Sequence, residues 1–115
     1  MENVNVNVNG YEFINELGGT RNGFYHKTIL KDKNGNEIAD YRINYLNRTW
    51  ESYTFQSVMK NCVYTLIENK FDDFLRLAKE KYGIKRLSKT KKEQARKVFE
   101  NLTEIKELQE VYNNL

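Results

Sequence analysis

The chain has 115 residues, a formal net charge of +3 and a single cysteine, Cys62. A length of this order is typical of one domain, and a lone cysteine cannot form the internal disulfides of a small secreted scaffold. No apolar run approaches the roughly 18 residues that a membrane span needs, and the start of the chain lacks the pattern of a signal peptide. We therefore expect a single domain over residues 1–115, in the cytoplasm and away from membranes.

The first part of the chain predicts antiparallel β-strands. Valine alternates with asparagine from residue 3 to residue 8, which is the two-residue period of a strand. Asn9-Gly10 then predicts a tight hairpin, because a type I′ turn needs positive φ at both central positions. Pairing across this turn places four apolar side chains on one face, in the pairs Val8–Tyr11 and Val6–Phe13.

A second hairpin is expected at Asn34-Gly35. Residues 18–23 are typical of a flexible connection, so the strands of this hairpin are expected at about 24–32 and 37–46. A two-residue loop gathers apolar residues in the pairs Phe24–Tyr45, His26–Ile43, Thr28–Tyr41 and Leu30–Ala39, and a slip of one residue would scatter them. The opposite face then carries Tyr25, Lys27, Ile29, Lys31, Ile38, Asp40, Arg42 and Asn44.

The second half of the chain predicts helices. Apolar residues recur there at three- and four-residue spacing, which marks one face of a helix. The first such run comprises Phe55, Val58, Met59, Cys62, Val63, Leu66 and Ile67. Thr49 or Ser52 can cap its start and Gly83 can follow its end, so this helix is expected at about 50–82.

Thr90 and Glu93 have the spacing of a capping box and predict a second helix at about 90–113. Its apolar residues recur about every 3.5 positions, which suits packing along the first helix or along a second copy in a homodimer. The sequence therefore predicts an α+β fold. An N-terminal antiparallel β-meander of three to four strands, over about residues 2–46, is followed by two long amphipathic helices.

No set of residues in the sequence has the pattern of an active site or a metal site. His26 and Cys62 are the only soft ligands, whereas a zinc site needs about four, and both are expected to fill the core. Gly18-Gly19 precedes a strand rather than the helix of a phosphate-binding loop. Asp72-Asp73 lies beside basic residues, as on a solvated helix face. We expect no catalysis, no metal and no cofactor.

Positive charge is concentrated in one segment. Lys79–Lys97 contains nine basic and two acidic residues, which gives +7 in a chain of net charge +3. Such a segment suits phosphates, which attract Lys and Arg whatever the base sequence, and it suits a solvated, solubilising surface equally well. The residues expected to bind nucleic acid are Lys85, Arg86, Lys89, Lys92 and Arg96.

Two further surfaces are candidates for binding a partner. The outer face of the sheet combines aromatic and basic groups that can stack bases or enter a groove, at Tyr25, Lys27 and Arg42. The corner between sheet and helix gathers residue types that are enriched at binding hot spots, at Arg48, Trp50 and Tyr53. Each surface has a structural alternative. A helix could cover the outer face of the sheet, and Trp50 could pack into the core under the first turn of the helix.

Residues 47–58 resemble a segment that recurs in small proteins of phages and conjugative elements of low-GC Gram-positive bacteria. Some of those proteins are anti-CRISPR inhibitors of the type II RNA-guided nuclease. The resemblance implies a protein of a mobile element that acts in the host bacterial cell, and no binding residue carries over from it. Many such inhibitors are acidic mimics of DNA, whereas this chain is mildly basic, so simple mimicry of duplex DNA is not expected.

The first functional hypothesis is thus a non-catalytic inhibitor that binds a host defence nuclease or its guide RNA complex. The alternative is a small nucleic-acid-binding accessory protein that uses the basic segment and the sheet face to hold DNA or RNA. A homodimeric module joined through the last helix is the third hypothesis.

Overall fold

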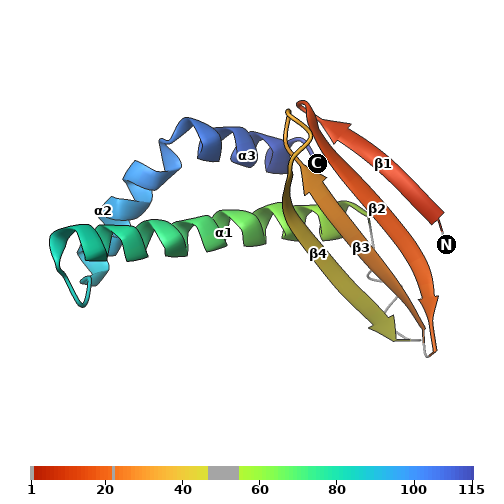
Figure 1. Cartoon of the computed structure of the whole chain (residues 1–115), viewed down its shortest axis with the longest axis horizontal. Helices are drawn as coiled ribbons and strands as arrows, with labels where there is room; N and C mark the ends of the chain where they lie inside the picture. The colour runs from red at the N-terminus through yellow and green to blue at the C-terminus, as the bar shows by residue number, and fades with distance from the viewer. Residues whose placement is uncertain (1, 22, 47–54) are drawn as a thin grey trace.

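The computed structural model describes residues 2–21, 23–46 and 55–115. Four strands, β1 (Glu2–Val8), β2 (Tyr11–Thr20), β3 (Gly23–Lys31) and β4 (Glu37–Leu46), form an antiparallel sheet in the order β1-β2-β3-β4. Three helices follow, α1 (Phe55–Tyr82), α2 (Lys89–Glu100) and α3 (Thr103–Asn113). Figure 1 shows α1 running away from the sheet, while α2 and α3 lead the chain back to it. The predicted α+β class and the meander are confirmed.

The first hairpin forms as the sequence predicts. Asn9 and Gly10 have φ values of 54° and 86°, the positive values that a type I′ turn requires. The Asn7 side chain accepts the Gly10 N–H at 3.2 Å, which ties the turn to β1. The predicted pairs Val8–Tyr11 and Val6–Phe13 are both present. They place the valines of β1 on the face that carries the core.

The predicted flexible connection at residues 18–23 is wrong. β2 continues through Gly18 and Gly19 to residue 20, and β3 begins at Gly23. Gly18 lies opposite Tyr25, and a Cβ atom on this glycine would lie 2.3 Å from Cε1 of that tyrosine. The tyrosine ring therefore fills the space above the glycine, which compensates for the missing side chain in a strand.

The second hairpin keeps all four predicted pairs, from Phe24–Tyr45 to Leu30–Ala39, but its loop differs. Residues 32–36 connect the strands, because the Asp32 carboxylate accepts the backbone N–H of Asn34 and of Asn36, each at 2.9 Å. The hydrogen bond from Asn36 is the main cause that lowers the pKa of Asp32. The longer loop produces a bulge after Leu30, and Ile38, predicted on the outer face, packs against the core instead.

The prediction of one long last helix is also wrong. α2 ends at Glu100 and α3 begins at Thr103. The Asn101 side chain donates to the Lys97 carbonyl at 2.9 Å, and Leu102 is extended with ψ of 136°, so the chain turns and α3 packs back toward the sheet. Ser88, rather than the expected Thr90, caps α2 and accepts the Lys91 N–H at 3.2 Å.

The first helix ends where it is expected to end. Gly83, with φ of 65°, donates to the Glu80 carbonyl, and the next residue donates to the Lys79 carbonyl at 3.0 Å. This pair of bonds is the Schellman motif that glycine favours after a helix. The predicted caps Thr49 and Ser52 lie outside the described residues.

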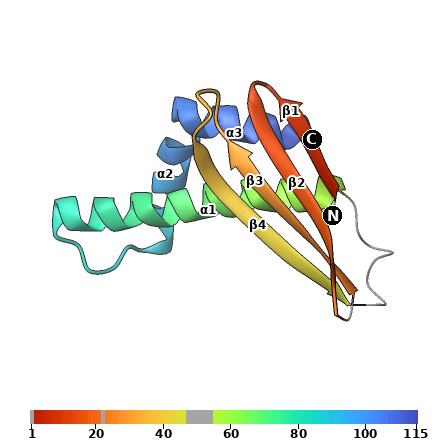
Figure 2. The ribbon, with the colours of Figure 1, turned by 45° about the vertical axis from the view of Figure 1, so that its right-hand side comes forward.

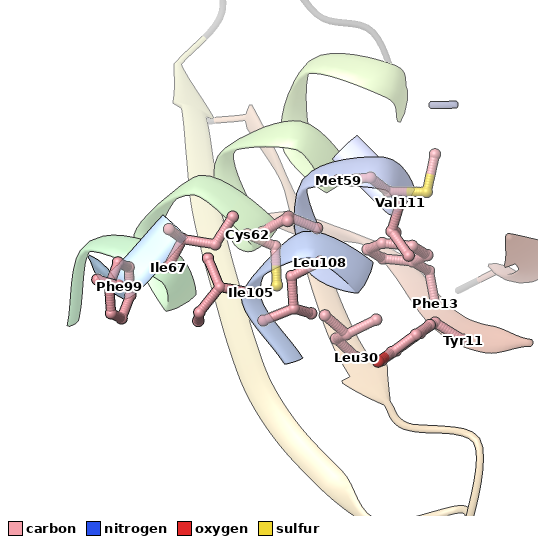
Figure 3. Packing of buried hydrophobic residues seen from close by; sticks show 11 residues of the cluster. Tyr11, Phe13, Leu30, Met59, Cys62, Ile67, Phe99, Ile105, Leu108 and Val111 are labelled. Carbon is pink, nitrogen blue, oxygen red and sulfur yellow. The ribbon is translucent and has the colours of Figure 1, made fainter. Parts of the chain in front are cut away.

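The core lies between the inner face of the sheet and the helices, as Figure 3 shows. Its buried apolar residues come from β2, β3 and all three helices: Tyr11, Phe13, Leu30, Met59, Cys62, Val63, Ile67, Phe99, Ile105, Leu108 and Val111. The last helices bury Phe99, Ile105, Leu108 and Val111 within the chain, whereas Val98 and Leu102 stay exposed. The homodimer expected through the last helix stays a prediction. None of the described helices is long and apolar enough to cross a membrane.

Candidate functional site

The end of the helices that lies farthest from the sheet (Figure 1) carries seven basic residues. This basic tip consists of the last turn of α1, the connection that follows it and the first turn of α2. Its members are Lys79, Lys81, Lys85, Arg86, Lys89, Lys91 and Lys92, and all but Lys79 are exposed. Glu80 is the one acidic residue in the same stretch of sequence.

The charge of the basic tip is not neutralised by nearby carboxylates. Ion pairs elsewhere join Lys33 to Glu107 and Lys70 to Glu104. Across the described ranges, no member of the basic tip has a carboxylate oxygen within 4.0 Å. The tip therefore presents a concentrated positive potential to its surroundings.

The position of three of these lysines disfavours the helix that carries them. Lys89, Lys91 and Lys92 stand in the first turn of α2, which contains no acidic residue. The positive end of the helix dipole lies there, so each cation costs about 0.3–1 kcal/mol at low salt. These lysines lower the stability of α2 and have no carboxylate partner among the described residues. Both properties are expected of a surface that binds anions.

Arg96, the fifth predicted nucleic-acid ligand, has a different environment. Its guanidinium donates to Glu68 at 2.9 and 3.2 Å and to Glu100 at 2.7 Å. It also lies over the Phe71 ring, 4.7 Å from the ring centroid. A phosphate would compete with two carboxylates for this group, so Arg96 joins α2 to α1. The other four predicted ligands (Lys85, Arg86, Lys89 and Lys92) all lie in the basic tip.

The predicted sheet site does come together on the outer face. Figure 2 shows the helices behind the sheet, so they leave this face open. The Arg42 guanidinium lies 4.2 Å from the centroid of the Tyr25 ring, and Lys27 pairs with Arg42 across the strands. The Tyr25 hydroxyl donates to Glu16 at 3.2 Å. Burial and then this hydrogen bond raise the pKa of Tyr25.

The electrostatics of this sheet face differ from those of the basic tip. Charged residues of both signs share the face. The cross-strand pairs Glu12–Lys31 and Glu16–Lys27 join opposite charges, and Asp40 and Arg42 on β4 add one charge of each sign. The Tyr25 ring contacts Gly18 and Arg42, so a base could stack on it only by moving the arginine. The face therefore suits a polar protein surface better than a nucleic-acid backbone.

The third predicted surface, Arg48, Trp50 and Tyr53, lies outside the described residues and stays a prediction. The helix that follows begins at Phe55, whose ring packs edge-on against His26 with centroids 4.9 Å apart. This contact anchors the start of α1 to the sheet.

The two soft residues are buried, as the sequence predicts. His26 is 0% exposed, and its Nε2 lies 2.8 Å from Asn15 Oδ1. Burial lowers the pKa of His26 to about 4 and raises that of the Cys62 thiol to about 12. Within the described part of the chain, no three residues of the types His, Cys, Asp and Glu are grouped to hold a metal ion.

Sequence reasoning found the basic segment but did not assign Lys79, Lys81 and Lys91 to a site. Gly83 ends α1 and Ser88 caps the start of α2. Because these two signals are only five residues apart, they could have predicted that the end of α1 and the start of α2 lie close together and carry these three lysines. Comparisons of this chain with protein-family models, curated proteins and solved structures find no match. The case for a function therefore rests on the chemistry of these surfaces.

Proposed function

We propose that this protein is a non-catalytic nucleic-acid-binding accessory protein whose basic tip contacts the phosphate backbone. The observation that carries the proposal is the set of unpaired lysines in the first turn of α2, where they oppose the helix dipole. A bound phosphate would reverse that effect, because an anion at a helix N-terminus interacts favourably with both the dipole and the lysines.

The shape of the tip indicates how it binds. The molecule is elongated, with extents of 49 × 30 × 21 Å, and the tip is the end of an arm rather than a channel. Such an end can touch one stretch of backbone without reading the base edges. The expected binding is independent of sequence and strongly salt-dependent, with about three to five phosphates neutralised.

The test is a triple substitution, Lys89→Gln with Lys91→Gln and Lys92→Gln, measured by equilibrium binding to labelled DNA and RNA across a salt series. Loss of about three phosphate contacts should weaken binding at least about 10-fold at about 150 mM salt and should flatten the slope of log affinity against log salt by about 2 to 3. The variant should fold normally, since removing cations from this helix terminus favours the helix.

The matched control changes three lysines near the sheet, Lys27→Gln with Lys31→Gln and Lys33→Gln, and so alters the net charge equally. It should bind within about twofold of the wild-type protein, since localised phosphate contacts set the affinity. Equal losses in the two variants would show a diffuse charge effect and contradict a site at the tip.

A second candidate function is inhibition of a guide-loaded defence nuclease, supported by the resemblance of residues 47–58 to anti-CRISPR and other mobile-element proteins. The basic tip would suit exposed backbone of the guide RNA, and the predicted surface at Arg48, Trp50 and Tyr53 would suit the protein. We expect excess protein to slow guided cleavage of DNA, and Trp50→Ala to relieve that inhibition. If guide-loaded nuclease cleaves equally fast in a large excess of this protein, the inhibitor hypothesis is wrong.

A further inference from the structure

The strand β1 forms an edge of the sheet that lacks the usual protection against pairing. Among the described strands it pairs only with β2. Apart from Glu2 at its start, the strand contains no charge and no proline, and the register with β2 runs without a bulge. Natural edges are generally blunted by such devices, because unpaired backbone groups invite another strand. The opposite edge, β4, carries Glu37, Asp40 and Arg42.

The turn fixes which backbone groups of β1 face outward. A two-residue hairpin loop closes on a hydrogen-bonded pair, here Val8 and Tyr11. In an antiparallel ladder such pairs recur at every second residue, so the valines direct their N–H and C=O groups toward β2. The peptide groups of Asn3, Asn5 and Asn7 therefore point away from the sheet, and no strand in the described part of the chain pairs with them.

We propose that two copies of this chain associate through β1, antiparallel, around a twofold axis at Asn5. In this register Asn5 faces its own copy, and Asn3 faces Asn7 of the second copy. Each of these pairs brings two outward N–H groups and two outward C=O groups into register, so each can exchange both hydrogen bonds. The two sheets then join into one continuous sheet.

The side chains favour the same register. Asparagine meets asparagine on the outer face and Val4 meets Val6 on the inner face, which covers Val4, now 40% exposed. A slip of one residue would oppose asparagine with valine and bring peptide groups already bonded to β2 into the new ladder. A slip of two residues keeps asparagine opposite asparagine and valine opposite valine, but the ladder then contains one hydrogen-bonded asparagine pair fewer. Because residues 3–8 are neutral and complementary to themselves, a second copy is the occupant that fits this edge.

The sharpest test uses cysteine at the axis. In a hydrogen-bonded pair the Cα atoms lie about 5.5 Å apart, within the range of a disulfide. Asn5→Cys should therefore form a covalent dimer under mild oxidation. Asn3→Cys should not, because Asn3 would lie more than about 12 Å from its own copy. The native Cys62 is buried and does not compete.

Asn44→Cys provides the control for random collisions, since Asn44 is exposed on the other edge strand. Selective cross-linking at position 5 supports the proposal, and equal cross-linking at positions 3, 5 and 44 overturns it. This inference goes beyond the nucleic-acid proposal, because β1 and the basic tip share no residue.

Sedimentation equilibrium of the unmodified chain gives an independent check. The wild-type protein should show a reversible dimer, and Asn5→Lys should weaken it at least about 10-fold by placing two like charges opposite each other. The matched change Asn44→Lys should leave the dimer unaltered. A wild-type chain that stays monomeric up to about 1 mM would overturn the proposal.

Discussion

Replacing Phe99 by alanine is expected to lower the free energy of unfolding by about 3–5 kcal/mol. Phe99 is 2% exposed and is the one buried residue of α2. Its ring packs against Phe71 and Phe74 with centroids 5.1 and 5.6 Å apart, so its removal leaves a cavity between α1 and α2. Denaturant titration measures the loss.

The position of Phe99 gives the substitution a second effect. Because α2 has no other buried anchor, the variant should release that helix before the sheet unfolds, and hydrogen exchange should lose protection in α2 first. The neighbouring Val98→Ala is the matched control. Val98 is 59% exposed, so its truncation should change stability by less than about 0.5 kcal/mol. Similar losses in both variants would contradict this account of the packing.

The strand pairing could be predicted because two independent signals agree. The alternation of side chains selects the inner face, and the Asn-Gly turn sets the offset, so a wrong register would conflict with one of them. That is why the pairs of both hairpins are confirmed. The loop at residues 32–36 was not predictable from the dipeptide at its centre, because the Asp32 side chain sets its length through bonds to Asn34 and Asn36.

Two features depend on contacts between distant residues and leave no local signal. Gly18 and Gly19 resemble a loop until the Tyr25 ring is placed over the first of them. The break at Asn101 and Leu102 contains neither glycine nor proline. It arises because α3 buries Ile105, Leu108 and Val111 in the core beside the sheet, which a straight continuation of α2 could not do.

The candidate site shows the same division between local and distant information. Counting charges locates the basic segment, and four of its five predicted ligands lie in the basic tip. Counting cannot show that Arg96 is bound by Glu68, which lies 28 residues earlier in the chain. Local sequence therefore predicts where a charge lies, whereas its availability depends on which helices pack together.

A decrease in pH from 7 to 4 is expected to remove about 3 kcal/mol of stability through His26 alone. Burial lowers the pKa of His26 from 6.5 to about 4 in the folded protein. Each unit of difference between the unfolded and folded pKa corresponds to about 1.4 kcal/mol. The cause is desolvation of the imidazolium in a site closed by Asn15 and Phe55.

The sign of this effect follows from proton binding. Between pH 6.5 and about 4 the unfolded chain binds a proton at His26 and the folded chain does not, so acid favours unfolding throughout this window. The contribution of neutral His26 is fully present above pH 6.5 and is lost as the pH falls toward 4. Asp32 responds later, because hydrogen bonding lowers its pKa from 3.8.

The variant His26→Gln isolates the contribution of His26 to the pH dependence of stability, because the glutamine amide can donate to Asn15 Oδ1 without titrating. Between pH 6.5 and 4 the free energy of unfolding of the wild-type protein should fall by about 3 kcal/mol more than that of the variant. The comparison is between the changes in the free energy of unfolding with pH. A loss of stability that the substitution causes equally at every pH therefore does not affect the result. His26 is the only histidine in the chain, and its imidazole NMR signals should therefore stay in the neutral position down to about pH 5. A midpoint near 6.5 in the folded protein would mean that the ring is hydrated, and the acid sensitivity should then be absent.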